Sequence, residues 1–126
     1  MIVIDTDVLI EIFDKKSEKG DEARKKILES GESISTTAIN LHEMLYGLQK
    51  YAKPVKEVEQ LPVLDYTMED AALSAKLELE AESRGTPMRR TDAMIAAIVV
   101  NNKASLYTSD LKHFQHLATV GLRLFG

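Results

Sequence analysis

The first strand constrains the fold of this chain more than any other feature. An apolar run over residues 1–4 stops at Asp5, a second carboxylate follows at Asp7, and residues 8–13 then have helical apolar spacing. This pattern predicts a buried strand that places Asp5 at its carboxyl end. Ligands bind at that end in open parallel α/β sheets, so Asp5 has a functional position by architecture. The simpler alternative is that Asp5 and Asp7 only cap the helix that follows.

Strand and helix patterns alternate along the rest of the chain. Apolar runs predict strands at residues 1–7, 33–36, 61–66, 104–108 and 119–125. Helical spacing predicts helices at residues 8–13, 17–30, 38–51, 67–85, 91–100 and 111–114. This order favours right-handed βαβ crossovers, and so a three-layer α/β/α sandwich around a mostly parallel sheet of about five strands. No repeat or long linker divides the sequence, and we expect a single domain over residues 1–126.

The apolar spacing within each helix also predicts its buried face. The helix at 91–100 is apolar on nearly every side, which is typical of a helix inside the fold. In the helix at 38–51 we expect the core stripe to be Leu41, Met44, Leu45 and Leu48. The helix at 17–30 has Ala23, Ile27 and Leu28 on one stripe and is expected to be partly solvated. In the helix at 67–85, the residues that follow helical spacing are Ala71, Ala72, Ala75, Leu79 and Glu82.

Composition excludes several classes of protein. The chain has no Cys, which excludes a disulfide framework, a thiolate zinc site and a cysteine nucleophile. No segment reaches the ~20 apolar residues of a membrane helix, and no basic region precedes the first apolar run as in a signal peptide, so we expect a soluble cytoplasmic protein. The net charge of −4 argues against a binder of nucleic acid that relies on a basic surface. It does not exclude a nuclease, because bound metal ions reverse the local sign of an acidic site.

Four acidic residues stand where a parallel sheet would bring them together. Asp5 and Asp110 follow strands, Asp92 begins the apolar helix, and Glu43 borders an apolar helix face. Gathered together, these carboxylates would repel one another unless a cation were present. Oxygen ligands without His or Cys suit Mg²⁺ or Mn²⁺ better than zinc, and such ions can activate water against a phosphodiester. Taken singly, each acid could equally be a helix cap or a solvated side chain.

Four segments, in this order, then match a known family. They are Ile4-Asp5-Thr6-Asp7-Val8-Leu9-Ile10, Leu41-His42-Glu43-Met44-Leu45-Tyr46-Gly47, Gly85-Thr86-Pro87 followed by Asp92-Ala93-Met94-Ile95-Ala96-Ala97, and Leu106-Tyr107-Thr108-Ser109-Asp110 with Phe114 after it. With these segments, the chain resembles the PIN-domain ribonucleases and, within them, the VapC-type toxins of prokaryotic toxin-antitoxin modules.

The resemblance implies a PIN-like fold and an endoribonuclease that cleaves RNA phosphodiester bonds with Mg²⁺ or Mn²⁺. It also implies a cognate antitoxin, which would place a basic side chain in the acidic cleft, and a homodimer. The residues that it implies as catalytic, metal-binding acids are Asp5, Glu43, Asp92 and Asp110, with Thr6 and Thr108 as supporting hydroxyl groups. Asp7 departs from the family pattern, in which Ser or Asn is common, and either caps a helix or alters metal occupancy.

Basic residues near the acids are candidates for substrate contact. Arg89 and Arg90 precede Asp92, and Lys112 follows Asp110, so these side chains could hold RNA phosphates. Surface charges of this kind are more often simply solvated. The three histidines, His42, His113 and His116, are weaker candidates for a general base.

Two other functions remain alternatives. A strand followed by Asp5-Thr6-Asp7 also resembles the start of a haloacid-dehalogenase-type phosphatase, in which the first Asp is a nucleophile. That alternative requires a Gly-rich continuation, but Val8-Leu9 follows, and it gives Glu43 no role. The second is a non-catalytic acidic α/β interaction module whose carboxylates are only helix caps.

Overall fold

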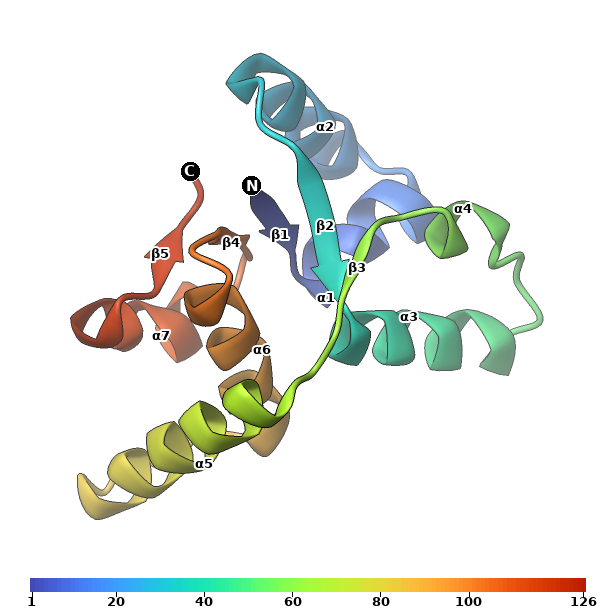
Figure 1. Cartoon of the computed structure of the whole chain (residues 1–126). Helices are drawn as coiled ribbons and strands as arrows, with labels where there is room; N and C mark the ends of the chain where they lie inside the picture. The colour runs from blue at the N-terminus through green and yellow to red at the C-terminus, as the bar shows by residue number, and fades with distance from the viewer.

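The N-terminal strand lies at the centre of a fully parallel sheet (Figure 1). The computed structural model describes residues 1–126. The sheet order is β3-β2-β1-β4-β5, so the chain builds outward from β1 on one side and then crosses over to build the other side. The strands are β1 (Ile2–Ile4), β2 (Ile34–Thr37), β3 (Val63–Leu64), β4 (Ser105–Tyr107) and β5 (Arg123–Leu124). The predicted parallel α/β/α sandwich of about five strands is confirmed.

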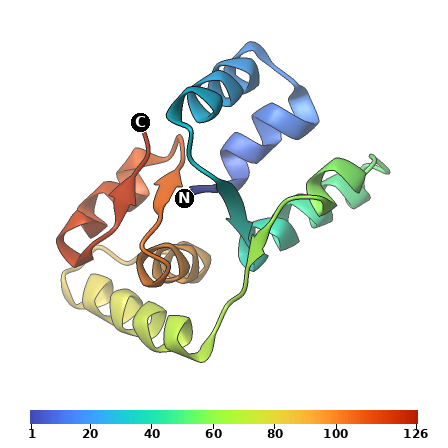
Figure 2. The ribbon, with the colours of Figure 1, turned by 45° about the horizontal axis from the view of Figure 1, so that its top comes forward.

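Helices connect all the strands and cover both faces of the sheet (Figure 2). They are α1 (Thr6–Leu9), the π-helical η1 (Ile10–Lys15), α2 (Glu18–Ser30), α3 (Ala38–Lys50), α4 (Lys56–Glu59), α5 (Met68–Ser83), α6 (Arg90–Asn101), α7 (Leu111–Phe114) and the 3₁₀-helical η2 (Gln115–Val120). None of these helices is both long and apolar enough to cross a membrane.

Side chains of β1 alternate between two hydrophobic cores, as the period of a strand requires. Ile2 and Ile4 pack on one face of the sheet against α1, η1, α2, α3 and α4. Val3 packs on the other face against α5, α6, α7 and η2, together with Leu106 of the neighbouring β4. Because β1 is buried on both faces, the backbone that leads into Asp5 is held firmly in place.

Helix caps lie where the sequence indicates them. The Thr37 side chain accepts a hydrogen bond from the backbone N–H of Asn40 and begins α3. Thr67 and Asp70 form a reciprocal capping box at the start of α5. Gly31 ends α2 with a φ of 69°, in the left-handed region that favours glycine.

Several predicted boundaries need correction. The predicted helix at 8–13 begins instead at Thr6 and changes from α to π at Ile10. The predicted strand at 61–66 pairs only over Val63–Leu64, and the one at 119–125 only over Arg123–Leu124. Both of these strands lie at sheet edges with one neighbour each, so few of their residues form ladder hydrogen bonds.

The predicted buried faces were right for α3 and α6 and partly wrong elsewhere. Met44 and Leu48 are buried, and α6 is buried along almost its whole length. Leu28 at the end of α2 is 80% exposed, contrary to the prediction. In α5 the residues that follow helical spacing do not form the inner face: Leu79 is 68% exposed, and the helix buries the side chains of Asp70, Ser74, Leu77 and Ala81. Apolar residues lie on more than one side of this helix, so spacing alone did not identify its inner face.

Candidate active site

An acidic cleft lies at the carboxyl edge of the sheet, close to where β1 and β4 end. It has a volume of about 220 Å³. The four predicted acids all line it, although they come from four separate parts of the chain. Its lining consists of Asp5, Thr6, Asp7, Ile10, Glu43, Arg89, Asp92, Ile95 and Asp110.

Asp5 is fixed by hydrogen bonds to both of its carboxylate oxygens. Oδ1 accepts from the backbone N–H of Thr6 at 2.9 Å and from Asn40 Nδ2 at 2.8 Å. Oδ2 accepts from the Thr108 hydroxyl at 2.7 Å. Asp5 is the N-cap of α1, as the simpler interpretation of the sequence proposed, and it also lines the cleft. The two interpretations of Asp5 are therefore compatible.

Asn40 connects Asp5 to Glu43, and the sequence prediction missed it. Its Nδ2 donates to Asp5 and also to Thr6 Oγ1 at 2.9 Å, and Thr6 Oγ1 in turn donates to Glu43 at 2.7 Å. The Asn40 Oδ1 accepts from Thr37 at 2.7 Å, and Asn40 is fully buried. Its position was the one available signal in the sequence: Asn40 lies four residues before Met44 and eight before Leu48, on the apolar face of the same helix.

Asp7 ties α1 to the segment that follows β4. Its Oδ1 accepts from the backbone N–H of Val8 at 2.8 Å, and its Oδ2 accepts from the backbone N–H of Ser109 at 3.0 Å. The Thr108 hydroxyl, which donates to Asp5, also accepts from the backbone N–H of Asp110 at 3.0 Å. Asp7 therefore helps to cap α1 and also holds the loop that carries Asp110 beside the cleft.

The other side of the cleft contains a cation from the chain itself. Arg89 Nε lies 3.1 Å from Asp92 Oδ2, and Arg89 Nη2 lies 3.8 Å from Asp110 Oδ2. Asp92 is buried in the first turn of α6, whereas the Arg89 side chain is 68% exposed. Arg89 thus bridges two of the acids and can move outward into solvent without unpacking the core.

Burial controls the electrostatics of this site. Loss of hydration raises the pKa of Asp5 to about 6, and repulsion from Asp7 acts in the same direction, against the hydrogen bonds from Thr108, Thr6 and Asn40. Burial also raises the pKa of Asp7. The hydrogen bond to Asp92 raises the pKa of Arg89. The cleft therefore favours a bound cation, because a cation would relieve the cost of ionising Asp5.

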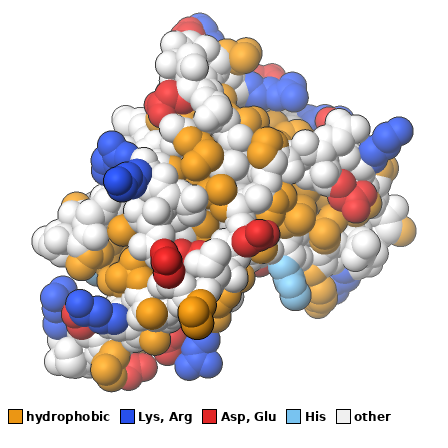
Figure 3. All heavy atoms as spheres, viewed as in Figure 1, with side chains coloured by type: hydrophobic (Ala, Val, Ile, Leu, Met, Phe, Trp, Pro, Cys, Tyr) orange, Lys and Arg blue, Asp and Glu red, His pale blue; other side chains and the backbone are white.

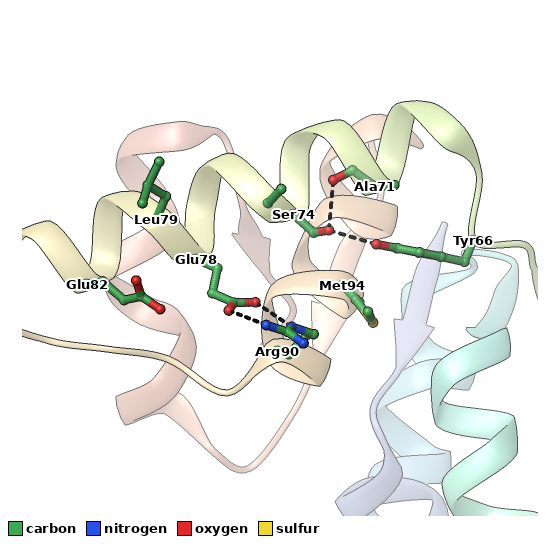
Figure 4. Close-up of a pocket in the computed structure, with 9 residues that line it drawn as sticks. Tyr66, Ala71, Ser74, Glu78, Leu79, Glu82, Arg90 and Met94 are labelled. Carbon is green, nitrogen blue, oxygen red and sulfur yellow. Dashed lines mark hydrogen bonds and ion pairs between the residues drawn. The ribbon is translucent and has the colours of Figure 1, made fainter.

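The other predicted residues lie outside the acidic cleft. Arg90 lines a different cavity, between α5 and α6, where it forms two hydrogen bonds of 3.1 Å with Glu78 (Figure 4). Lys112, His113 and His116 line a neighbouring cavity, and His113 Nδ1 contacts Asp110 Oδ2. His42 is exposed on α3.

The donor atoms of the cleft fit a hard divalent cation, although they are not gathered into a finished cage. No group of three or more His, Asp or Glu side chains lies close enough together to hold one ion. The available donors are carboxylate oxygens, which Mg²⁺ and Mn²⁺ prefer, and these ions keep several waters in place of protein ligands. Arg89 occupies the space between Asp92 and Asp110.

These features define a parallel α/β/α domain with an acidic cleft at the carboxyl edge of its sheet. A family model described as "PIN domain" matches residues 2–120, and the chain belongs to this family.

Curated relatives and a solved structure agree with this assignment. The chain is 25% identical over 113 residues to the "tRNA(fMet)-specific endonuclease VapC" of Salmonella typhimurium, covering 84% of each chain. It is 23% identical over 99 residues to "Ribonuclease VapC2" of Rickettsia felis, covering 73% of this chain and 74% of that protein. The crystal structure of VapBC2 from Rickettsia felis bound to a promoter DNA fragment superposes with a TM-score of 0.81 at 22% identity, covering 99% of this chain and 98% of that one.

Proposed function

We propose that this chain is a VapC-type endoribonuclease, the toxin of a toxin-antitoxin pair, and that it hydrolyses RNA phosphodiester bonds with Mg²⁺ or Mn²⁺. The observation that carries the proposal is the convergence of Asp5, Glu43, Asp92 and Asp110 on one cleft in a PIN-family chain. The two curated relatives bear the names of a tRNA endonuclease and a ribonuclease. The superposed structure is a VapBC complex, which favours a cognate antitoxin as partner of this chain too.

The roles of the residues follow from their contacts. Asp5 is the central ligand, because it is the acid most firmly held and the one whose ionisation a cation would most favour. Glu43, Asp92 and Asp110 complete the donor set from the other walls of the cleft. A bound Mg²⁺ or Mn²⁺ would supply charge stabilisation and an activated water. Arg89 would exchange its carboxylate partners for an RNA phosphate when the cation enters.

The network around Asn40 argues against the phosphatase alternative. A phosphatase nucleophile at Asp5 would give Glu43 no role. Here Glu43 is held by Thr6, and Thr6 is held by the same Asn40 amide group that holds Asp5. The two carboxylates are therefore positioned together, as expected of a shared cation site.

The proposal is tested by RNA cleavage with purified protein. We expect a structured RNA to be cut in the presence of Mg²⁺ or Mn²⁺ and left intact in EDTA. Asp5→Asn and Glu43→Gln should each lower the rate by at least about a hundredfold, beyond the usual effect of residues that only orient a metal ligand.

A matched control is Glu78→Gln, which removes a carboxylate that pairs with Arg90 outside the cleft. This variant should cleave RNA at the unaltered rate. Cleavage that persists at full rate in Asp5→Asn, or that needs no divalent cation, would count against the proposal.

A further inference from the structure

A second cavity opens beside the acidic cleft, and the proposed chemistry does not use it. It has a volume of about 440 Å³, within the range of roughly 300–1,000 Å³ typical of ligand pockets. The turn between α5 and α6 forms one wall, and α7 with η2 forms the other. Its lining is Arg84, Thr86, Pro87, Met88, Lys112, His113 and His116, and we call it the basic pocket.

The basic pocket and the acidic cleft share a wall at two places. Met88 lines the pocket, and the next residue, Arg89, lines the cleft. On the other side, His113 lines the pocket and contacts Asp110, which lines the cleft. A ligand that extends from one cavity into the next would therefore cross this boundary between Arg89 and Asp110.

The charge of the basic pocket is of one sign. Arg84 and Lys112 are cations, and no carboxylate belongs to the lining. Neither Arg84 nor Lys112 forms an ion pair within the chain. The comparison is a cavity near Tyr107 whose lining holds Glu11 and Glu22 as well as Lys19 and Lys26, so that it contains as many acidic as basic side chains.

This one-sided charge is unexpected on a protein with a net charge of −4. The face shown in Figure 3 carries acidic and basic side chains interspersed with apolar ones, with no broad basic surface. Unpaired cations beside a nuclease cleft fit a polyanion that continues beyond the cleft, since Arg and Lys bind phosphate oxygens through charge-assisted hydrogen bonds.

We propose that the basic pocket binds the RNA nucleotide that flanks the scissile phosphodiester, with Arg84 and Lys112 on its phosphate. This inference rests on the proposed ribonuclease function and deepens it, because it defines the side of the cleft along which the RNA strand runs. Contacts to phosphate give no base specificity, so the pocket contributes affinity and register.

The test is equilibrium binding of a fluorescent single-stranded RNA in EDTA, where cleavage plays no part. Each phosphate contact contributes about 0.7 to the slope of log K against log salt for a single strand. Because Arg84 and Lys112 share one phosphate, the double variant Arg84→Gln with Lys112→Gln should lower that slope by about 0.7 and weaken binding about fivefold at about 0.1 M salt. The matched control, Lys19→Gln with Lys26→Gln, removes two cations from the cavity whose lining also holds Glu11 and Glu22, and should change the affinity less than about twofold.

Cleavage kinetics separate this inference from the proposed function. In Mn²⁺ the Arg84 and Lys112 double variant should raise KM for a long RNA at unchanged kcat, because the pocket binds ground state and transition state alike. A dinucleoside monophosphate, which has the scissile phosphate but no flanking phosphate for Arg84 and Lys112, should be cleaved equally by both proteins. Failure of cleavage itself would overturn the nuclease proposal, whereas the binding experiment reports on the pocket alone.

Three results would overturn the inference. The first is unchanged RNA affinity in the double variant, and the second is an equal loss in the control. The third is tighter binding of polyglutamate than of RNA, which would identify an acidic protein segment as the occupant.

Discussion

The Asn40 side chain positions two acids of the cleft with one amide group. It donates one hydrogen bond to Asp5 and another to Thr6, which holds Glu43. Its own oxygen accepts from Thr37, so every polar atom of this buried side chain has a partner. Removing the amide would leave Thr6 Oγ1 without its donor and would take one of three hydrogen bonds from the buried Asp5, which is costly for buried polar groups.

Asn40→Ala should therefore weaken the site more than it weakens the fold. We expect Mn²⁺ affinity to fall about ten- to hundredfold, the usual effect of losing a group that orients a metal ligand. The measurement is a calorimetric Mn²⁺ titration together with thermal unfolding. Asn102→Ala is the control, since Asn102 bonds only the carbonyl of Ile98 at the far end of α6, and it should leave Mn²⁺ affinity unchanged. Equal affinities in Asn40→Ala and the unaltered chain would contradict the positioning role.

The raised pKa of Asp5 makes the stability of the metal-free protein depend on pH. The pKa is about 6 in the folded chain against an ordinary value of 3.8, so the folded state binds the extra proton between these values. The stability that this proton on Asp5 contributes is fully present below pH 3.8 and is lost as pH rises through 6. The shift corresponds to about 3 kcal/mol in the free energy of unfolding.

Comparison with Asp5→Asn isolates this effect. In EDTA, the free energy of unfolding of the unaltered chain relative to Asp5→Asn should fall by about 2 kcal/mol between about pH 4 and pH 6.5. Urea unfolding at a series of pH values measures this difference. Saturating Mn²⁺ should remove or reverse the fall, because the cation binds the ionised carboxylate. Parallel curves for the two proteins in EDTA would show that Asp5 ionises normally.

Close packing between two helical elements, η1 and α2, sets the position of one wall of the cleft. A Cβ atom on Gly20 of α2 would lie 2.2 Å from the backbone oxygen of Glu11 in η1, so only glycine fits this contact. The π-helical turn begins at Ile10, which lines the cleft. The close contact of α2 at Gly20 therefore supports η1, the helical element that begins in the cleft lining.

Two glycine substitutions should have opposite effects on stability. Gly20→Ala forces α2 away from η1 and should cost at least about 1–3 kcal/mol, as overpacking usually does. Gly47 lies within α3, and a Cβ added there would have no heavy atom within 4 Å. Gly47→Ala should therefore stabilise the protein by about 0.5–1 kcal/mol, because glycine loses more conformational freedom in a helix than alanine does. Urea midpoints of the two variants test the pair, and equal shifts in the same direction would be inconsistent with it.

Elements could be predicted well from the sequence where nearly every residue is apolar, and less well elsewhere. The helix at 91–100 and the strand around Leu106 were clear because burial on all sides leaves little choice of pattern. Spacing did not reveal the inner face of α5, because this face buries Asp70 and Ser74, two polar residues that are hydrogen-bonded to Asn101 and Tyr66. Asn40 was missed for the same reason, since a hydrogen-bonded polar residue in a core gives no hydrophobic signal.

Topology alone was enough to indicate which acids would meet. Asp5 and Asp110 follow β1 and β4, which are neighbours in the sheet. The pairing of Arg89 with Asp92 and Asp110, and the diversion of Arg90 to Glu78, depend on side-chain directions that no spacing rule specifies.

The whole molecule is acidic, so the proposed cation must change the field that RNA meets. In EDTA, Glu43→Gln should bind RNA severalfold more tightly than the unaltered chain, because a unit charge at about 4 Å is worth about 1 kcal/mol even in water. In Mn²⁺ the order should reverse, because the variant has lost a cation ligand. Fluorescence anisotropy with labelled RNA in the two buffers measures both affinities.

The control for this reversal in the order of RNA affinities is Glu29→Gln. Glu29 lies near the end of α2, just before β2 begins, and therefore at the amino edge of the sheet, opposite the cleft. It should alter neither affinity. The same order of affinities in both buffers would refute the idea that metal reverses the local field.

The sheet order also has a consequence for synthesis of the protein. β1 is made first, but its Asp5 gains its Thr108 partner only after β4 has been made and has paired beside it. A ribosome builds the chain from the N-terminus, and folding follows emergence from the exit tunnel. A growing chain that ends before Asp110 cannot contain the complete cleft, so the ribosome making it is not exposed to a finished nuclease until translation has passed that residue.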